Sequence, residues 1–516
     1  MTDEIRAPKE DLGRSMLSGM TWQYVSIFVQ AFLNLFVLGT LSRLLSPDDF
    51  GVMGIAAIFV GLAELFSELG VGPAIIQHRE LTRNHTRVGF TIAVLLGIIL
   101  VAILWVAAPL IAIFFKSVQV TPVLRGVGFD FFLGSFGVVS EGLLRRKLKF
   151  RKLMWINVVA YALGYALVGV TMAFTGFGVW ALVGATLSQS LLKSIMLLVV
   201  EPHSLKPSFA PRELREIVHF GGGITLARLF NYAASQGDYF VVGRTMGAGP
   251  LGLYTRAYRL MLLPSTYLGR ALDSVLFPVM AKIQDQLARL TRTYLTGIAL
   301  IGLTCAPLET IMIILAPEIV TVVLGPKWTE AIVPFQILAF GILPRVSYKI
   351  DNSLARATGS VYQRSIRDAI YAATVVLGAW SGLRWGLQGV ATGVLIAVVL
   401  NDVMAIKMSL GILHSSWVEY FKTQTPGLLL SLVVLITALP VRILLHSNGL
   451  PDWLVLGASG GISGLCLAGI FFWQPQRILG SYGVDAMGII FRSVPVRLVP
   501  KAVLQWYQNR IAEAVT

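Results

Sequence analysis

The sequence predicts an all-α integral membrane protein with about fourteen transmembrane helices, and three observations lead to this prediction. Hydrophobic residues make up 55% of the 516 residues, and the mean hydropathy is +0.73. Only 13% of the residues are charged, whereas a soluble domain has about 25%. The charges gather in short segments between long apolar runs. The surface of a soluble protein of this length needs more charged side chains than this sequence contains. We therefore expect lipid to be the solvent of most of the chain.

The apolar runs match the roughly twenty residues that a helix needs to cross the hydrocarbon core. They are expected at residues 15–41, 51–76, 88–115, 121–143, 153–174, 177–200, 217–242, 251–280, 293–316, 329–352, 365–383, 386–411, 425–446 and 452–473. The connections between them are short, which excludes a large soluble domain. The first run is too long for a signal peptide, so we expect this helix to be retained.

The basic residues indicate the orientation of the chain. Of the 42 Lys and Arg residues, 28 fall on alternate segments that include both termini, and six fall on the opposite loops. This bias predicts that both termini are cytoplasmic, and it independently favours an even number of spans. It also explains the net charge of +15 without nucleic acid as a partner, leaving anionic membrane lipids as the expected contact.

A weak internal repeat predicts two lobes. The segment Pro47-Asp48-Asp49-Phe50-Gly51 is echoed about 205 residues later by Pro250-Leu251-Gly252-Leu253-Tyr254. Because six spans separate the copies, the repeats are expected to be parallel. The predicted organisation is an N-terminal six-helix lobe (1–200), a cytoplasmic inter-lobe loop (201–216), a C-terminal six-helix lobe (217–411), two additional helices (425–473) and a cytoplasmic amphipathic tail (474–516).

Metal and redox chemistry have no sequence support. Cys305 and Cys466 lie far apart in apolar runs, and the six His residues form no metal-binding spacing. We therefore expect no cofactor, with coupling to a proton or sodium gradient left open.

Polar residues follow one face of four predicted spans, where a charge is costly and usually faces a partner or water. Span 1 contains Gln23, Ser26, Gln30 and Asn34, and span 2 contains Gly61, Glu64 and Glu68. Span 7 contains Thr225, Arg228, Tyr232, Ser235 and Asp238, and span 8 contains Arg256, Arg259, Thr266, Arg270 and Asp273. If the lobes meet along these helices, the stripes line one hydrated cavity. The arginines suit a phosphate-bearing anion, because a guanidinium binds phosphate oxygens bidentately.

Each stripe also has a purely structural interpretation. Arg270 and Asp273 could neutralise each other, and Glu64 could pair with Arg228 or Arg270. For Arg256 and Arg259, near the outer end of span 8, snorkelling to the headgroups is the favoured interpretation. A structural role is expected for Arg125, Arg345 and Lys349.

Two motifs resemble the polysaccharide transporter family, the Wzx-type flippases of the MOP superfamily. They are the segment from Leu41 to Gly51, LSRLLSPDDFG, and the segment from Gly237 to Leu260, which contains GDYFVVGR and LGLYTRAYRL. The resemblance implies two six-helix lobes in a V, with helices 1, 2, 7 and 8 around a central cavity. It implies translocation of a polyprenyl-(pyro)phosphate-linked oligosaccharide from the cytoplasmic to the outer leaflet of the bacterial inner membrane, for lipopolysaccharide, O-antigen or exopolysaccharide synthesis. A polysaccharide polymerase and export machinery are the expected partners.

By position, the resemblance implies the arginines of the substrate-binding set, while the polar stripes supply its other members and the candidates for ion coupling. The substrate-binding set is Arg228, Arg270, Arg256, Arg259, Gln23, Gln30 and Asn34, and the candidates for ion coupling are Glu64, Glu68, Asp238 and Asp273. Span 1 departs from the family because it has no buried Arg. We therefore expect the phosphate to be bound mainly by the C-terminal lobe.

Two other functions remain open from the sequence. A multidrug-type antiporter of the same superfamily would favour an acidic, aromatic cavity, which the arginine stripes disfavour. A membrane-embedded glycosyltransferase or polymerase would use an acidic pair such as Asp48-Asp49. Such enzymes need a large outer loop, and an N-terminal cap of span 2 is the favoured explanation of this pair. We therefore predict a transporter and not an enzyme.

Overall fold

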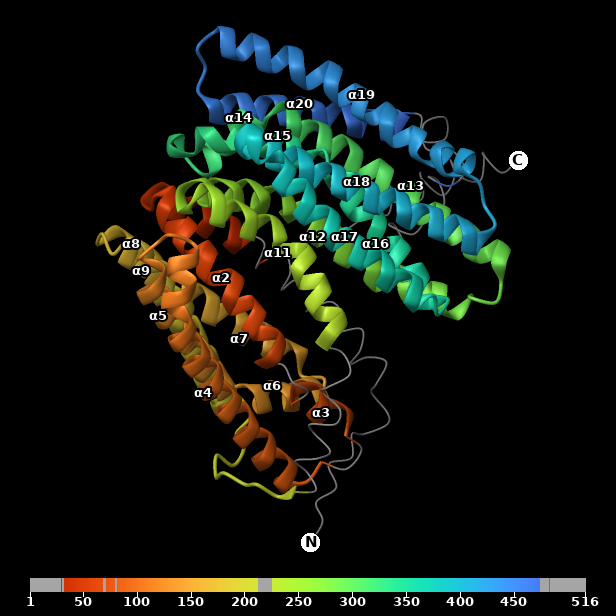
Figure 1. Ribbon diagram of the computed structural model, residues 1–516. Coiled ribbons are helices and arrows are strands. Elements are labelled where there is room, and N and C mark those ends of the chain that lie inside the picture. The colour runs from red at the N-terminus through yellow and green to blue at the C-terminus, as the bar shows by residue number, and fades with distance from the viewer. Residues whose placement is uncertain are drawn as a thin grey trace. The chain divides into compact units, whose positions relative to one another are not determined.

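The computed structural model describes Val29, residues 32–67, 71–78, 81–211, 225–473 and Tyr482. The chain divides into two compact units, which are Met1–Thr255 with Val323–Lys327 (unit 1) and Arg256–Val322 with Trp328–Thr516 (unit 2). Throughout the described residues the regular elements are helices, which confirms the all-α prediction (Figure 1). Gln23, Gln30, Glu68 and the predicted tail helix lie outside the described residues.

Unit 1 contains the first predicted spans. Its elements are the helix Phe32–Leu44, α2 (Pro47–Ser67), α3 (Val71–Gln77), α4 (Arg83–Phe114), α5 (Val120–Ser135), α6 (Val138–Arg146), α7 (Phe150–Val159), the π-helical η2 (Ala160–Val168), α8 (Gly169–Phe174), α9 (Val179–Val200), α11 (Thr225–Met246) and the start of α12 (Ala248–Lys282). The predicted lobe boundary at residues 201–216 rests on the sequence repeat and stays a prediction.

Unit 2 contains the rest of α12 and the later helices. These are α13 (Leu287–Ile314), α14 (Ala316–Val323, all but its last residue), the short η4 (Pro326–Ala331, from Trp328 on), α15 (Ile332–Ala339), α16 (Ile342–Ala357), α17 (Val361–Gly382), η5 (Leu383–Trp385), α18 (Gly386–Leu413), α19 (Trp417–Ser447) and α20 (Asp452–Trp473). Helices α17 and α18 pack along each other, as do α13 and α19 (Figure 1).

The described residues contain eight helical stretches that are long and apolar enough to cross a membrane, or up to ten if two bent helix pairs each count as one span. One stretch, Tyr362–Leu413, includes both α17 and α18, and the polar helices α11 and α12 fall outside the set. The chain is thus a multi-pass membrane protein, and the number fourteen stays a prediction.

The start of α2 is fixed by a capping box. Asp49 Oδ2 accepts hydrogen bonds from the Ser46 backbone N–H at 2.9 Å and from its hydroxyl at 2.7 Å. The Asp49 N–H in turn donates to Ser46 Oγ at 3.2 Å. Ser46 is therefore the N-cap and Asp49 is its partner in the first turn, which satisfies two backbone donors of the helix end. This geometry supports the capping explanation of Asp48-Asp49.

The two copies of the repeat motif contact each other at the starts of α2 and α12, within unit 1. A Cβ added to Gly51 would lie 1.7 Å from the Ala248 carbonyl oxygen, and one added to Gly252 would lie 1.8 Å from the Pro47 carbonyl oxygen. The contact is reciprocal, because Pro47 precedes Gly51 by four residues, as Ala248 precedes Gly252. The helices approach this closely only because each motif has glycine at the crossing.

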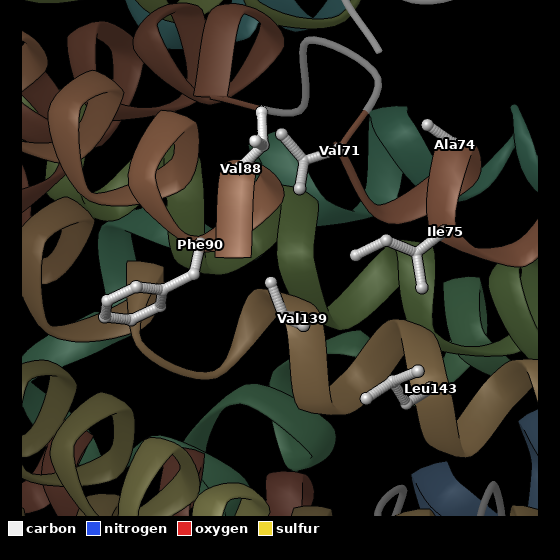
Figure 2. Close-up of a cluster of buried hydrophobic side chains, with 7 residues drawn as sticks. All are labelled: Val71, Ala74, Ile75, Val88, Phe90, Val139 and Leu143. Carbon is white, nitrogen blue, oxygen red and sulfur yellow. The ribbon is translucent and has the colours of Figure 1, made fainter. Parts of the chain in front are cut away.

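A cluster of buried apolar side chains joins α3, α4 and α6 (Figure 2). Its members are Val71, Ala74, Ile75, Val88, Phe90, Val139 and Leu143. Ile75 and Val139 are almost completely buried, at 1% and 0% exposure. This cluster holds the short helices α3 and α6 against the end of the long helix α4.

An ion-pair network follows α9. Glu201 is paired with Lys147 and, at 3.2 Å, with Lys149, and its backbone carbonyl accepts a hydrogen bond from Ser140 at 2.8 Å. Burial raises the pKa of the Glu201 carboxyl, but the hydrogen bonds and charges of the two lysines outweigh it. The pKa therefore lies below its usual value. Burial alone lowers the pKa of the neighbouring His203.

We predict that Gly51→Ala destabilises the protein by about 1–3 kcal/mol, because the new methyl group forces α2 and α12 apart. The measurement is thermal unfolding of the full chain in detergent, followed by intrinsic fluorescence. Gly54→Ala is the matched control one turn later, where an added Cβ makes only a contact of 3.4 Å with Leu251. Equal unfolding temperatures for the two variants would contradict the reciprocal contact.

Glu201→Gln is expected to lower stability at neutral pH, because the ionised carboxylate binds Lys147 and Lys149. A carboxyl whose folded pKa is lowered contributes stability above its unfolded pKa of about 4.3 and loses it as the pH falls through the folded value. The difference in unfolding temperature between the wild type and the variant should therefore shrink on acidification. A difference independent of pH would show that the ion pairs are not its cause.

Candidate functional site

The structure places the predicted site residues in both units. Asn34 is half-buried and Glu64 is exposed in unit 1, where Arg228 lies on α11 with only its backbone described. Four residues of the stripe on α12 lie in unit 2, with Arg256 and Asp273 half-buried and Arg259 and Arg270 exposed. The substrate-binding and ion-coupling assignments of all these residues stay predictions.

Two of the four polar helices meet in unit 1. The Tyr232 hydroxyl of α11 donates to the Ile58 carbonyl of α2, and Gly61 leaves room for the tyrosine ring. Helix α11 is thus packed against α2 through members of the two predicted stripes.

Asp238 is a buried member of the α11 stripe. It is 1% exposed, its Oδ2 accepts a hydrogen bond from the Tyr254 hydroxyl of α12 at 2.8 Å, and its Oδ1 accepts one from the Tyr239 N–H at 3.0 Å. Both carboxylate oxygens are therefore occupied by protein donors. This geometry favours a structural link between α11 and α12.

Asp273 binds partners on α16. Its Oδ1 accepts hydrogen bonds from the Arg356 guanidinium and the Ser353 hydroxyl. The Arg356 guanidinium also stacks on the Phe277 ring, 4.5 Å from its centroid. Asp273 therefore neutralises Arg356 and joins α12 to α16. The sequence suggested Arg270 as the partner of Asp273, whereas the structure pairs Asp273 with Arg356.

Lys349 of α16 lies directly beside the α12 stripe. Its ammonium donates to the Ser265 carbonyl at 2.7 Å, and a Cβ at Gly269 would lie 2.4 Å from its side chain. Arg270 and Arg345 both repel it electrostatically. Gly269 thus makes room for a second cation next to Arg270.

We define the α12–α16 cationic cluster as Arg270, Arg345, Lys349 and Arg356. Arg345 stacks on the Tyr258 ring of α12, 4.9 Å from its centroid. Among the described residues that act on Lys349, the only carboxylate is Asp273, which is already paired with Arg356. Asp273 therefore leaves Lys349 and Arg270 without a carboxylate of their own among the described residues, so these two neighbouring cations favour an anion and are unsuited to a cationic ligand.

Arg345 and Lys349 of α16 were assigned a structural role from the sequence alone, yet the structure brings them to the predicted phosphate-binding stripe. The sequence does contain a pattern that identifies these residues. Arg345, Lys349 and Arg356 follow helical spacing along one face of α16, which is the same pattern that identified the stripe of α12. Because α16 is not one of the four helices with predicted polar stripes, the prediction did not include these residues.

Asp238 and Tyr254 are expected to be energetically coupled. In a double-mutant cycle with Asp238→Asn and Tyr254→Phe, we predict a coupling of about 1–2 kcal/mol, because the buried hydrogen bond joins a charged acceptor to a neutral donor. The measurement is unfolding of each variant in detergent. Strictly additive losses would contradict the link between α11 and α12.

Comparisons with known proteins identify relatives of this chain and a similar fold. The chain is 24% identical over 444 residues to lipopolysaccharide biosynthesis protein WzxC of Escherichia coli (strain K12), covering 85% of this chain and 89% of that protein. It is 25% identical over 422 residues to succinoglycan biosynthesis transport protein ExoT of Rhizobium meliloti (strain 1021), covering 79% of this chain and 82% of that protein. Its fold is similar to that of lipid II flippase MurJ in the inward closed conformation, with a TM-score of 0.70 and 14% sequence identity. The similarity covers 88% of this chain and 99% of that chain. Residues 40–333, more than half of the chain, match the model of the polysaccharide biosynthesis protein family, and the chain therefore belongs to this family.

Proposed function

We propose that the chain translocates a polyprenyl-(pyro)phosphate-linked oligosaccharide from the cytoplasmic to the outer leaflet for surface polysaccharide synthesis. Membership of the polysaccharide biosynthesis protein family supports the pathway, and the names of the WzxC and ExoT relatives support export of a glycan. The bacterial inner membrane is then the expected location, with both termini in the cytoplasm as the basic loops indicate. A polymerase and export proteins are the expected partners.

The observation on which this proposal mainly depends is the α12–α16 cationic cluster. A phosphate or pyrophosphate group would supply the negative charge that Lys349 and Arg270 lack, and a guanidinium can bind its oxygens bidentately. The exposed guanidinium of Arg270 has no carboxylate partner among the described residues and is the first candidate for contact. Arg228, Arg256 and Arg259 are further candidates for binding the lipid headgroup.

The physical problem that such a transporter solves is the transfer of a glycan through hydrocarbon. Each hydroxyl that loses its water partners without replacement costs several kcal/mol. Polar stripes on the helices would replace part of this hydration, while the prenyl chain stays in lipid. Alternating access of the binding site to the two sides of the membrane is the mechanism we propose. Gln23, Gln30 and Asn34 are the proposed glycan-binding residues of the N-terminal lobe.

The test is a leaflet-translocation assay in proteoliposomes with a labelled polyprenyl-pyrophosphate glycan. We predict that Arg270→Gln and Lys349→Gln each reduce the initial rate about 10- to 100-fold, because each removes a charge-assisted hydrogen bond to phosphate worth about 1.5–3 kcal/mol. Lys282→Gln is the matched control, since Lys282 is an exposed cation in the last turn of the same helix.

Wild-type rates in both cluster variants would contradict the role of the cluster. If the wild type exports cationic dyes and does not move the lipid-linked glycan, the multidrug-type antiporter is the correct function. The assay therefore distinguishes a wrong site from a wrong substrate.

A further inference from the structure

A second polar network lies inside unit 2, where α13, α16, α17, α18 and α19 supply side chains. Three of its charged residues are nine-tenths or more buried, with exposures of 0% for Asp351, 9% for Asp402 and 4% for Arg367. Arg367 and Asp402 lie on a stretch that is apolar enough to span the membrane, and Asp351 lies on α16, which passes this test together with the preceding helical segment as a bent pair. Such groups remain ionised only if the protein supplies partners for their charges, because hydrocarbon supplies none.

Asp351 has donors at one oxygen only. Its Oδ1 accepts hydrogen bonds from the Tyr294 hydroxyl of α13 at 2.8 Å and from the Ser409 hydroxyl of α18. Its Oδ2 is buried and has no hydrogen-bond partner among the described residues. An ionised carboxylate accepts at both oxygens, so the vacant oxygen is where a proton would reside.

Asp402 lies two turns before Ser409 on α18, and its charge acts on Asp351 with the same sign. Its Oδ1 is also buried without a hydrogen-bond partner in the described part of the chain. Tyr420 of α19 faces both carboxylates, and its hydroxyl is 3.0 Å from that of Ser347. Two like charges in a dry site repel each other strongly, which favours protonation of one of them.

The positive charge available to this pair is shared. The Arg367 guanidinium acts on both Asp351 and Asp402. Its Nη2 donates to Asn352 and, at 3.0 Å, to Asp368, while its Nε and Nη1 have no partner among the described residues. Asp368 also pairs with Arg364 at 3.5 Å. Arg367 is therefore shared among Asp351, Asp402 and Asp368, and its single charge does not neutralise the Asp351–Asp402 pair.

We propose that Asp351 and Asp402 form a proton-binding site that holds one proton between the two carboxyl groups, through which a transmembrane proton gradient acts on unit 2. The proton comes from water and returns to water, and no other bond changes. A sodium ion fits less well, because Arg367 would repel it and the hydroxyls of Tyr294 and Ser409 donate toward the carboxylate. The link to a gradient rests on the proposed transport function, whereas the proton site itself does not.

The test is pH-dependent infrared difference spectroscopy of the full chain reconstituted in lipid without any substrate, followed at the carbonyl stretch of protonated carboxyl groups. The wild type should show this band at neutral pH and lose it reversibly at alkaline pH. Asp351→Asn or Asp402→Asn should each remove the component of the band that belongs to this pair, because the remaining carboxylate is then neutralised by Arg367. The difference between the wild-type and variant spectra separates this component from other buried carboxyl groups such as Glu309. Asp285→Asn, at an exposed carboxylate of unit 2, should retain this component.

A wild type without a titrating band overturns the proposal whether or not the variants fold. So does a band that is identical in the wild type and both folded variants, or one that sodium ions remove at constant pH. A titrating band in a protein that fails to move the lipid-linked glycan would reject the proposed function and leave the proton site standing. In a transporting wild type, an imposed proton gradient should change the initial rate, and Asp402→Asn should remove this response.

Discussion

The reciprocal glycine contact between the starts of α2 and α12 is the constraint on which the N-terminal unit depends. Gly51 faces the Ala248 carbonyl and Gly252 faces the Pro47 carbonyl, so the two repeat copies cross backbone against backbone. In a membrane, close backbone packing of this kind is a main source of helix association, because lipid offers no hydrophobic drive between helices. The same crossing fixes the register at which Asp238 of α11 meets Tyr254 of α12.

Unit 2 contains two groups of charged residues of opposite balance. The α12–α16 cationic cluster has more basic groups than carboxylates, while the network around Asp351 and Asp402 has more carboxylates than guanidiniums. Both share helix α16, whose face with Arg345 and Lys349 borders α12 and whose residue Asp351 contacts α13 and α18. If an anion binds the first group and a proton binds the second, one helix contacts both ligands.

The sequence predicted the all-α fold, the membrane location, the family and a capping role for Asp49, because hydropathy, motif residues and helix caps are local signals; it did not predict that the N-cap itself is Ser46. It also selected Arg270 and Asp273 by helical spacing. It did not predict that Asp273 pairs with Arg356 or that Lys349 fits against Gly269, since both contacts join segments some eighty residues apart. Asp351 and Asp402 escaped notice because isolated carboxylates in different spans show no pattern until the helices pack.

The central claim is that this protein recognises a phosphate-bearing prenyl lipid through the α12–α16 cationic cluster. Native mass spectrometry of the purified full chain with polyprenyl pyrophosphate and with the matching polyprenol tests it most directly, because the two lipids differ only in the anionic group. The account predicts retention of the pyrophosphate lipid by the wild type, weaker retention after Arg270→Gln, and little retention of the polyprenol. Equal retention of both lipids, unaffected by the substitution, would contradict it.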